Sequence, residues 1–333
     1  MFIKTQVAQF AFVRWFVDSL DLQPSVNATK NTWNAVKLAT RENFAKLPWM
    51  DQSTAKGALE HVDSILSVLP LPEHLQTHEA LEVFYGYLEP DESQPFISWL
   101  IKTQHRRLEE QKRLLMEDPT VVIHRDDILF DSFTLNAFYY PLYHIMVVLP
   151  AFMAPPAVSQ TVPVAVNYGA IGKTLGHELT HAFDPLFTTL SRTGEATTWW
   201  SVQSFTNFRS RLDCVRRQLK NYTADEVYSK NALSETFADT AGIEKARLAF
   251  ASLTAQTGIL GYTQEQLFFI AGCFQFCSEG AYVWGIQKQY PPWVLRCNLP
   301  AQNEKRFAAA FNCPIEAALN PKKRCTFHST ERD

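Results

Sequence analysis

Apolar side chains recur at helical spacing through much of the chain. Residues from about 30 to 115 are predicted to be mainly helical, because apolar side chains lie three or four positions apart between residues 31 and 69, and prolines near residues 70 and 90–95 interrupt the pattern. Beyond that point, charge-rich or periodic segments predict further helices at 100–116, 168–183, 201–220, 234–253 and 263–281. Two aromatic and β-branched segments, 133–140 and 143–149, predict short strands instead. The pattern therefore predicts an α+β chain that is predominantly α-helical with a small sheet.

Length and composition narrow the class of protein. The 333 residues fit about two domains at roughly 100–200 residues each. The formal net charge is −3 and the basic residues are scattered, so no nucleic-acid partner is expected. No apolar run reaches the roughly 18 residues of a transmembrane segment. The apolar N-terminus, residues 1–17, is broken by Gln6, Gln9 and Arg14, and predicts a core-facing amphipathic helix rather than a signal peptide.

Cysteines and glycosylation signals bear on the compartment. The six cysteines all lie in the C-terminal part of the chain, none in a CxxC pattern, and their even number allows disulfides. Asn27 and Asn221 each begin an Asn-x-Thr sequon. Together these features favour an extracellular, oxidising location.

An HExxH pattern occupies residues 177–181. Positions i and i+4 share one face of a helix, so the imidazoles of His177 and His181 can reach one ion, while Glu178 can face a metal-bound water. The alternative is that the pattern arose by chance. We estimate that a chance HExxH pattern occurs in roughly one chain in a hundred of this length. An apolar stripe on the opposite helix face favours the zinc interpretation.

A second helical pair supplies the rest of a metal site. Glu235 and Asp239 are again four residues apart on a predicted helix. A catalytic zinc ion uses three protein ligands and an open fourth position, so Glu235 is predicted as the third ligand, with Asp239 orienting one of the histidines. A carboxylate pair on a helix is usually solvated surface, but Phe237, Ala238 and Ala241 predict a buried helix here.

With these residues in place, the sequence resembles the neprilysin and endothelin-converting-enzyme family of zinc peptidases. The segment from Asn167 to Asp184 is similar to the family's zinc helix, and the segment from Glu235 to Asp239 is similar to its second zinc helix. The resemblance runs from about residue 30 to Cys325, and its shorter motifs are Trp49-Met50-Asp51, Asn136-Ala137-Phe138-Tyr139, Trp199-Trp200, Arg296, Asn303, Phe307, Cys313 and Asn320-Pro321.

The resemblance implies a domain organisation and a location. It implies a zincin-type, thermolysin-like catalytic domain at residues 116–333 and part of a second helical lobe, with a linker, at residues 1–115. The family is one of type II membrane or secreted ectopeptidases with a much longer extracellular region. This chain is therefore expected to be extracellular, as a secreted protein or as an ectodomain at the plasma membrane.

The resemblance also implies substrate contacts and a disulfide. Asn136 and Ala137 would pair with the backbone of a peptide substrate as an added edge strand, and Arg296 would hold a substrate carbonyl or carboxylate. Cys214 and Cys325 look like a disulfide pair of the family. Cys277 and Cys313 match positions whose usual partners lie in the family's N-terminal part, so here they are free, pair with each other, or pair with Cys273 or Cys297.

The sequence departs from the family at the oxyanion side of the site. Where the family has an oxyanion-stabilising His, in an Asp-x-His context, this chain has Tyr290 and Lys288. Losing one oxyanion donor typically costs about 10²–10³ in rate, which a tyrosine hydroxyl can partly offset. Lys173 and Thr174 replace apolar residues that line the family's substrate side-chain pocket, and Pro185 replaces an Asp.

Three interpretations follow from this sequence. The first is a zinc metalloendopeptidase that hydrolyses peptide bonds in small peptides, with one catalytic Zn²⁺, with Glu178 as general base and with Tyr290 as a catalytic hydrogen-bond donor. The second is a zinc-binding but catalytically impaired relative that binds or sequesters peptides. The third is a piece of a longer enzyme.

Overall fold

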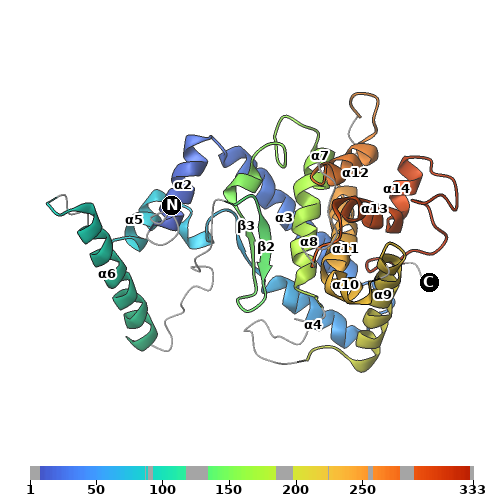
Figure 1. Cartoon of the computed structure of the whole chain (residues 1–333), viewed down its shortest axis with the longest axis horizontal. Coiled ribbons are helices and arrows are strands. Elements are labelled where there is room, and N and C mark those ends of the chain that lie inside the picture. Colours follow the sequence, from blue (N-terminus) through green and yellow to red (C-terminus); the bar gives the residue numbers. More distant parts are fainter. Residues whose placement is uncertain are drawn as a thin grey trace.

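The computed structural model describes residues 8–86, 88, 93–117, 134–184, 198–223, 225–253, 258–277 and 289–330. Within these ranges the chain is mostly helical with one small sheet (Figure 1), so the predicted fold class is confirmed. No helix in the described ranges is long and apolar enough to cross a membrane. Pro185 and Lys288, named above as departures from the family, lie outside the described residues.

Two buried helices form the centre of the molecule. Helix α8 (Lys173–His181) packs along α11 (Leu233–Ala251), and both contribute apolar side chains to the main core. The helices approach closely where Gly176 faces Gly242. A Cβ added at Gly242 would lie 2.6 Å from the backbone nitrogen of His177. Only glycine therefore allows the separation that brings the functional side chains of the two helices together.

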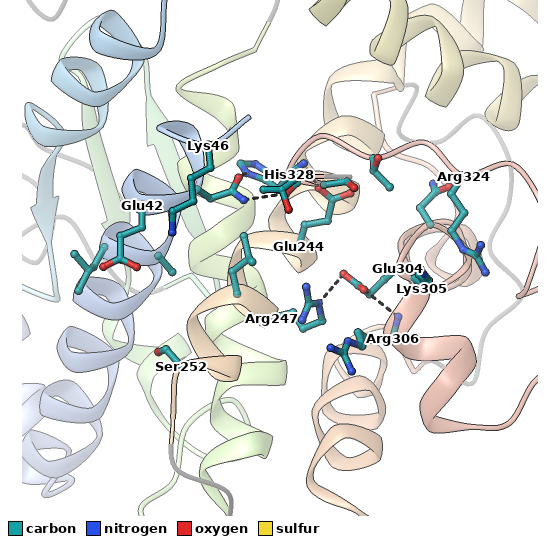
Figure 2. Close-up of a pocket in the computed structure, with 18 of the residues that line it drawn as sticks. Glu42, Lys46, Glu244, Arg247, Ser252, Glu304, Lys305, Arg306, Arg324 and His328 are labelled. Atoms are coloured by element: carbon teal, nitrogen blue, oxygen red, sulfur yellow. Dashed lines mark hydrogen bonds and ion pairs between the residues drawn. The ribbon is translucent and has the colours of Figure 1, made fainter. Parts of the chain in front are cut away.

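Other helices surround this pair. Helix α3 (Gln23–Phe44) packs against α11 and also lines a groove with the C-terminal segment (Figure 2). Six of the described helices begin at residues whose side chains accept a hydrogen bond from the first turn, as expected of N-caps: Asp51, Thr77, Ser201, Asp225, Thr263 and Glu304. The remaining elements are α2 (Gln9–Ser19), α4 (Gln52–Asp63), η1 (Glu73–Leu75), α5 (His78–Phe84), α6 (Phe96–Glu117), η2 (Pro150–Met153), α7 (Val164–Asn167), η3 (Tyr168–Gly172), α9 (Val202–Lys220), α10 (Glu226–Asn231), α12 (Gln264–Phe274), α13 (Trp293–Asn303) and α14 (Lys305–Ala310).

The sheet has the order β1-β3-β2. Strand β3 (Ile145–Val148) is buried in the middle, β1 (Leu66–Val68) pairs with it in parallel, and β2 (Ala137–Tyr140) pairs with it antiparallel. The register sets Ala137 opposite Val148. The hairpin of β2 and β3 agrees with the two predicted strands. Strand β2 packs against α8, so its edge lies beside the central helix pair.

The mainly helical structure expected over residues 31–69 is present, with interruptions at two places. The chain leaves the helix before Pro48, which has no N–H to donate, and α4 begins after the cap at Asp51. Residues 66–68 then form β1, because pairing with the buried strand β3 outweighs the local helical pattern. The predicted N-terminal helix is present from Gln9 and buries Phe10, Val13 and Val17; residues 1–7 lie outside the described residues.

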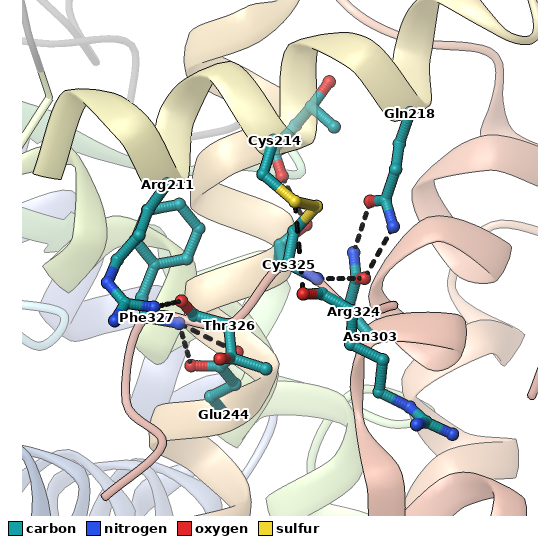
Figure 3. The surroundings of a disulfide bond; sticks show 11 residues. Arg211, Cys214, Gln218, Glu244, Asn303, Arg324, Cys325, Thr326 and Phe327 are labelled. Carbon is teal, nitrogen blue, oxygen red and sulfur yellow. Dashed lines mark hydrogen bonds between the residues drawn. A yellow bond between two sulfur atoms is a disulfide. The ribbon is translucent and has the colours of Figure 1, made fainter. Parts of the chain in front are cut away.

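Disulfides tie the C-terminal part together. Cys214 on α9 is bonded to Cys325 (Figure 3), as the family resemblance implied. The Asn303 side chain accepts a hydrogen bond from the backbone of Cys325 at 2.8 Å, which fixes this segment against α13. A second disulfide joins Cys273 on α12 to Cys297 on α13. Of the pairings left open by the sequence, the structure therefore has Cys277 and Cys313 as free thiols.

The close approach of α8 and α11 predicts the effect of a single added methyl group. Gly242→Ala should lower the free energy of unfolding by about 1–3 kcal/mol, the usual cost of overpacking a core, and should weaken metal binding as α8 is displaced. Denaturant unfolding and metal titration measure both effects. Gly172→Ala is the matched control: its Cβ would meet Thr32 Cγ2 at an ordinary 3.4 Å, so stability should be kept. Equal losses in the two variants would contradict this account.

Candidate metal centre

Three potential metal ligands converge where α8 faces α11. The ligand atoms of His177, His181 and Glu235 all lie within 4.8 Å of one another. His177 Nε2 is 3.0 Å from His181 Nε2 and 3.3 Å from Glu235 Oε2, and His181 Nε2 is 3.7 Å from Glu235 Oε1. The histidines come from successive turns of α8 and the glutamate from the first turn of α11. The structure thus brings together the three residues that the sequence predicts as zinc ligands.

The donor atoms of this cluster fit a divalent metal ion. Two imidazole nitrogens at 3.0 Å can share at most one proton, so at least one lone pair points into the cluster. The Oδ1 atom of Asp239 is 2.9 Å from His177 Nδ1, which holds the proton there and leaves Nε2 as the ligand atom. Glu235 Oε2 is buried and has no hydrogen-bond partner in the described part of the chain. Two imidazoles and a carboxylate form the donor set of a catalytic zinc site.

Charge around His177 strengthens this interpretation. Burial would lower the pKa of His177, but the carboxylate of Asp239 outweighs burial and raises this pKa to about 10. Burial would raise the pKa of Glu235, but the neighbouring histidines and Arg296 lower it below its usual value. Both values belong to the metal-free protein. The carboxylates therefore make the electrostatic potential at the site negative. This potential strongly favours binding of a cation, either a proton or a metal ion.

Asp239 is held by two partners at once. Its carboxylate accepts hydrogen bonds from Arg296 Nε at 2.7 Å and Nη2 at 2.9 Å, in addition to its contact with His177. Burial would raise the pKa of Asp239, but these partners keep it well below its usual range. An ionised carboxylate that is 2% exposed requires such pairing. Arg296, predicted as a substrate contact, is thus also the partner that keeps Asp239 charged.

Aromatic rings sandwich the Arg296 guanidinium. Its Cζ atom lies 5.1 Å from the centre of the Tyr290 ring and 4.9 Å from that of Phe276. Burial and the charge of Glu235 raise the pKa of Tyr290 to about 12, so its hydroxyl stays protonated at neutral pH. The backbone oxygen of Tyr290 accepts a hydrogen bond from the Tyr228 hydroxyl at 2.6 Å. Tyr290 is therefore a neutral donor beside the candidate ligands.

Glu178 lies directly between the two histidines in sequence and is 5% exposed. Burial raises the pKa of Glu178, while the nearby histidines lower it in part.

The substrate-binding candidates lie on the neighbouring edge strand. Asn136 Oδ1 accepts a hydrogen bond from the backbone of Ala137 at 3.0 Å, and β2 has no second neighbour among the described strands.

The sequence analysis missed several residues that support the site. The carboxylate of Asp184 lies 3.8 Å from His181 Nδ1 and accepts a hydrogen bond from the Ser234 hydroxyl. Its position three residues after His181 was the signal that could have identified it. Lys245, fully buried in α11, donates a hydrogen bond to Thr180 Oγ1 at 2.7 Å and so joins the two helices. Nothing in the local sequence predicts that contact.

Comparison with known proteins agrees with this geometry. The family model described as Peptidase family M13 matches residues 136–327. The chain is 29% identical to an endothelin-converting enzyme homolog of Locusta migratoria, over 96% of this chain and 45% of that protein. It is 28% identical to neprilysin-1 of Caenorhabditis elegans, over 90% of this chain and 41% of that protein.

Solved structures share the fold. A zinc metalloprotease of Mycobacterium tuberculosis, in complex with an inhibitor, superposes with a TM-score of 0.72 at 20% identity, covering 98% of this chain and 50% of that one. PepO of Lactobacillus rhamnosis superposes with a TM-score of 0.70 at 20% identity, covering 92% of this chain and 47% of that one. The chain therefore shares the fold of these solved structures.

The chain belongs to peptidase family M13, in agreement with the resemblance to neprilysin and endothelin-converting enzymes. It spans a little under half the length of the curated relatives that it matches.

The raised pKa of His177 predicts how metal affinity depends on pH. Below about pH 10 zinc must displace a proton from this imidazole, so its apparent affinity should rise about tenfold per pH unit from this group alone. Asp239→Asn removes the carboxylate that raises the pKa, so the slope should flatten above roughly pH 7. Competition with a chromophoric chelator measures the slope. Asp63→Asn, which removes an Arg-paired carboxylate elsewhere, is the control. An unchanged slope in Asp239→Asn would contradict the assignment.

Proposed function

We propose that this chain is the catalytic part of a zinc-dependent metalloendopeptidase that hydrolyses peptide bonds in small peptides. The observation that carries the proposal is the convergence of His177, His181 and Glu235 beside the buried Glu178. A zinc ion held by these three residues would act as a Lewis acid and would lower the pKa of a water molecule. The zinc metalloprotease of Mycobacterium tuberculosis and the fold it shares with this chain support the choice of metal.

The residues of the chain supply the remaining chemistry. Glu178 accepts the proton of the attacking water and passes it to the leaving amine, and its raised pKa brings it closer to a working neutral pH. The peptide adds at Asn136 and Ala137 to the edge of β2 that has no neighbour among the described strands. Two nitrogens of Arg296 already bind Asp239, so its remaining N–H groups are the ones that reach a substrate oxygen.

We also propose an extracellular location and a two-part organisation for this chain. Two disulfides support an extracellular chain that meets peptides outside the cell. The chain would divide into a partial helical lobe at 1–115 and a catalytic domain at 116–333, and the two parts share a core. Helix α3, on the N-terminal side of that boundary, shares the main core with α8 and α11. The two parts would therefore form one continuous unit near the metal centre.

A second candidate function rests on Tyr290. It stands where the family has a histidine, and its ring stacks on Arg296. If the hydroxyl does not reach the oxyanion, the protein would bind zinc and peptides yet cleave them slowly. This candidate is a peptide-binding relative rather than an efficient enzyme.

The role of Glu178 predicts a separation of metal binding from turnover. Glu178→Gln should lower kcat/KM by about 10²–10⁴, the usual contribution of a general base, while zinc content stays at one ion per chain. A cleavage assay on mixed peptides with a chelator control, together with metal analysis, measures both quantities. Glu60→Gln, a surface glutamate paired with Lys56, should leave both unchanged. Wild-type rates in Glu178→Gln would rule out the proposed role.

Two substitutions at Tyr290 distinguish the candidate functions. Tyr290→Phe keeps the ring on Arg296 but removes the hydroxyl. If the hydroxyl donates to the oxyanion, kcat should fall by about 10²–10³ with little change in KM. Tyr290→His should then give no gain over wild type. A large gain in Tyr290→His, with no loss in Tyr290→Phe, would instead favour the impaired relative.

A further inference from the structure

A groove of about 820 Å³ lies on the molecule outside the metal centre, between α3, α11, α14 and the C-terminal segment (Figure 2). None of the candidate metal ligands lines it. Its volume falls within the roughly 300–1,000 Å³ of small-molecule sites. Because α11 contributes to both places, the groove and the metal centre share one helix.

The lining of the groove is strongly basic. Its three carboxylates are Glu42, Glu244 and Glu304, whereas the chain as a whole carries a net charge of −3. The basic residue at position 322 is paired with Glu316, a carboxylate outside the lining, at 2.8 Å. The six basic residues of the lining are Lys46, Arg247, Lys305, Arg306, Lys322 and Arg324.

Two of the carboxylates are already engaged. Glu304 lies 2.9 Å from Arg247 Nε through one oxygen and accepts the backbone N–H of Arg306 through the other. Glu244 accepts hydrogen bonds from the backbone of Phe327 and His328, and burial, together with the charge of Glu304, raises its pKa to about 7. At neutral pH Glu244 therefore carries only part of a negative charge.

Guanidinium groups near Glu304 have N–H donors without a hydrogen-bond partner. The Nε atom of Arg324 is buried without a hydrogen-bond partner in the described part of the chain, whereas Arg247 Nε is already paired with Glu304. Within the same ranges, the guanidinium of Arg306 makes no ion pair or side-chain hydrogen bond, although its backbone N–H bonds to Glu304. Figure 2 shows Arg247 and Arg306 on either side of Glu304, with Arg324 farther along the same wall. Planar guanidinium forks of this kind match carboxylate and phosphate oxygens.

The opposite wall of the groove is partly apolar. Ala35, Leu38 and Ala39 of α3 and Leu248 of α11 contribute apolar surface, beside the polar Glu42 and Asn43. Leu38 on α3 is 53% exposed and so offers apolar surface to a bound molecule. The groove thus offers an arginine cluster on one side and a patch of apolar side chains on the other.

We propose that this groove binds a small organic anion. Its phosphate or carboxylate group would contact Arg247, Arg306 and Arg324, and its apolar portion would lie against Leu38 and Leu248. This proposal is independent of peptide hydrolysis, because no residue of the groove belongs to the metal centre.

Isothermal titration of the whole chain with phenyl phosphate, benzoate and inorganic phosphate tests the proposal. We expect one saturable site, with phenyl phosphate binding more tightly than inorganic phosphate. Benzoate shows whether a carboxylate serves as well as a phosphate. The variant Arg306→Gln with Arg324→Gln should weaken phenyl phosphate binding about tenfold or more, since charge-assisted hydrogen bonds are lost. Arg306→Gln alone, at an exposed position, gives the same direction of change if the double variant unfolds.

Matched controls separate a built site from general charge effects. Arg209→Gln with Arg217→Gln removes two exposed arginines of α9 and should leave binding unchanged. Leu38→Ser should weaken phenyl phosphate but not inorganic phosphate, whereas Leu108→Ser, at a similar 52% exposure on α6, should affect neither. Absence of saturable binding by all three probes would overturn the proposal, as would an equal loss in the α9 control.

Discussion

The close contact between α8 and α11 is the constraint on which the candidate site depends. The helices can approach this closely because glycines face each other at 176 and 242. One helix presents two imidazoles and the other presents two carboxylates, each pair separated by one helical turn. A wider separation would leave Glu235 unable to reach the point that both histidines face. Helix periodicity therefore places each pair of side chains on one helix face, and the packing of α8 against α11 brings the two faces together.

A chain of charges extends outward from this contact. His177 is bonded to Asp239, Asp239 to Arg296, and Arg296 is stacked between Tyr290 and another ring. Each buried charge in this chain of charges has a partner of opposite charge. The attraction between partners offsets the desolvation penalty that an unpaired buried charge would have. The disulfide at Cys297 follows Arg296 directly and fixes its helix to α12. The part of the molecule that holds the metal is thus linked to the part where an oxyanion would form.

Much of the site could be predicted because its signals are local. Residues four positions apart share a helix face whatever the tertiary structure, so His177, His181, Glu235 and Asp239 were identifiable from spacing. Strand β1 was not, because its partner β3 lies about 80 residues away and its own sequence fits a helix equally well. The contacts of Arg296 with Asp239 and of Lys245 with Thr180 also join segments distant in sequence. Those contacts depend on packing that no local pattern encodes.

Direct observation of the ion tests the proposed metal centre. Zinc-saturated protein should be examined by diffraction at the zinc absorption edge. The account predicts one strong anomalous peak per chain, with the Nε2 atoms of His177 and His181 and a carboxylate oxygen of Glu235 at about 2.0–2.2 Å, and a fourth position open to solvent. A peak elsewhere, or an ion bound by the histidines with Glu235 turned away, would contradict it.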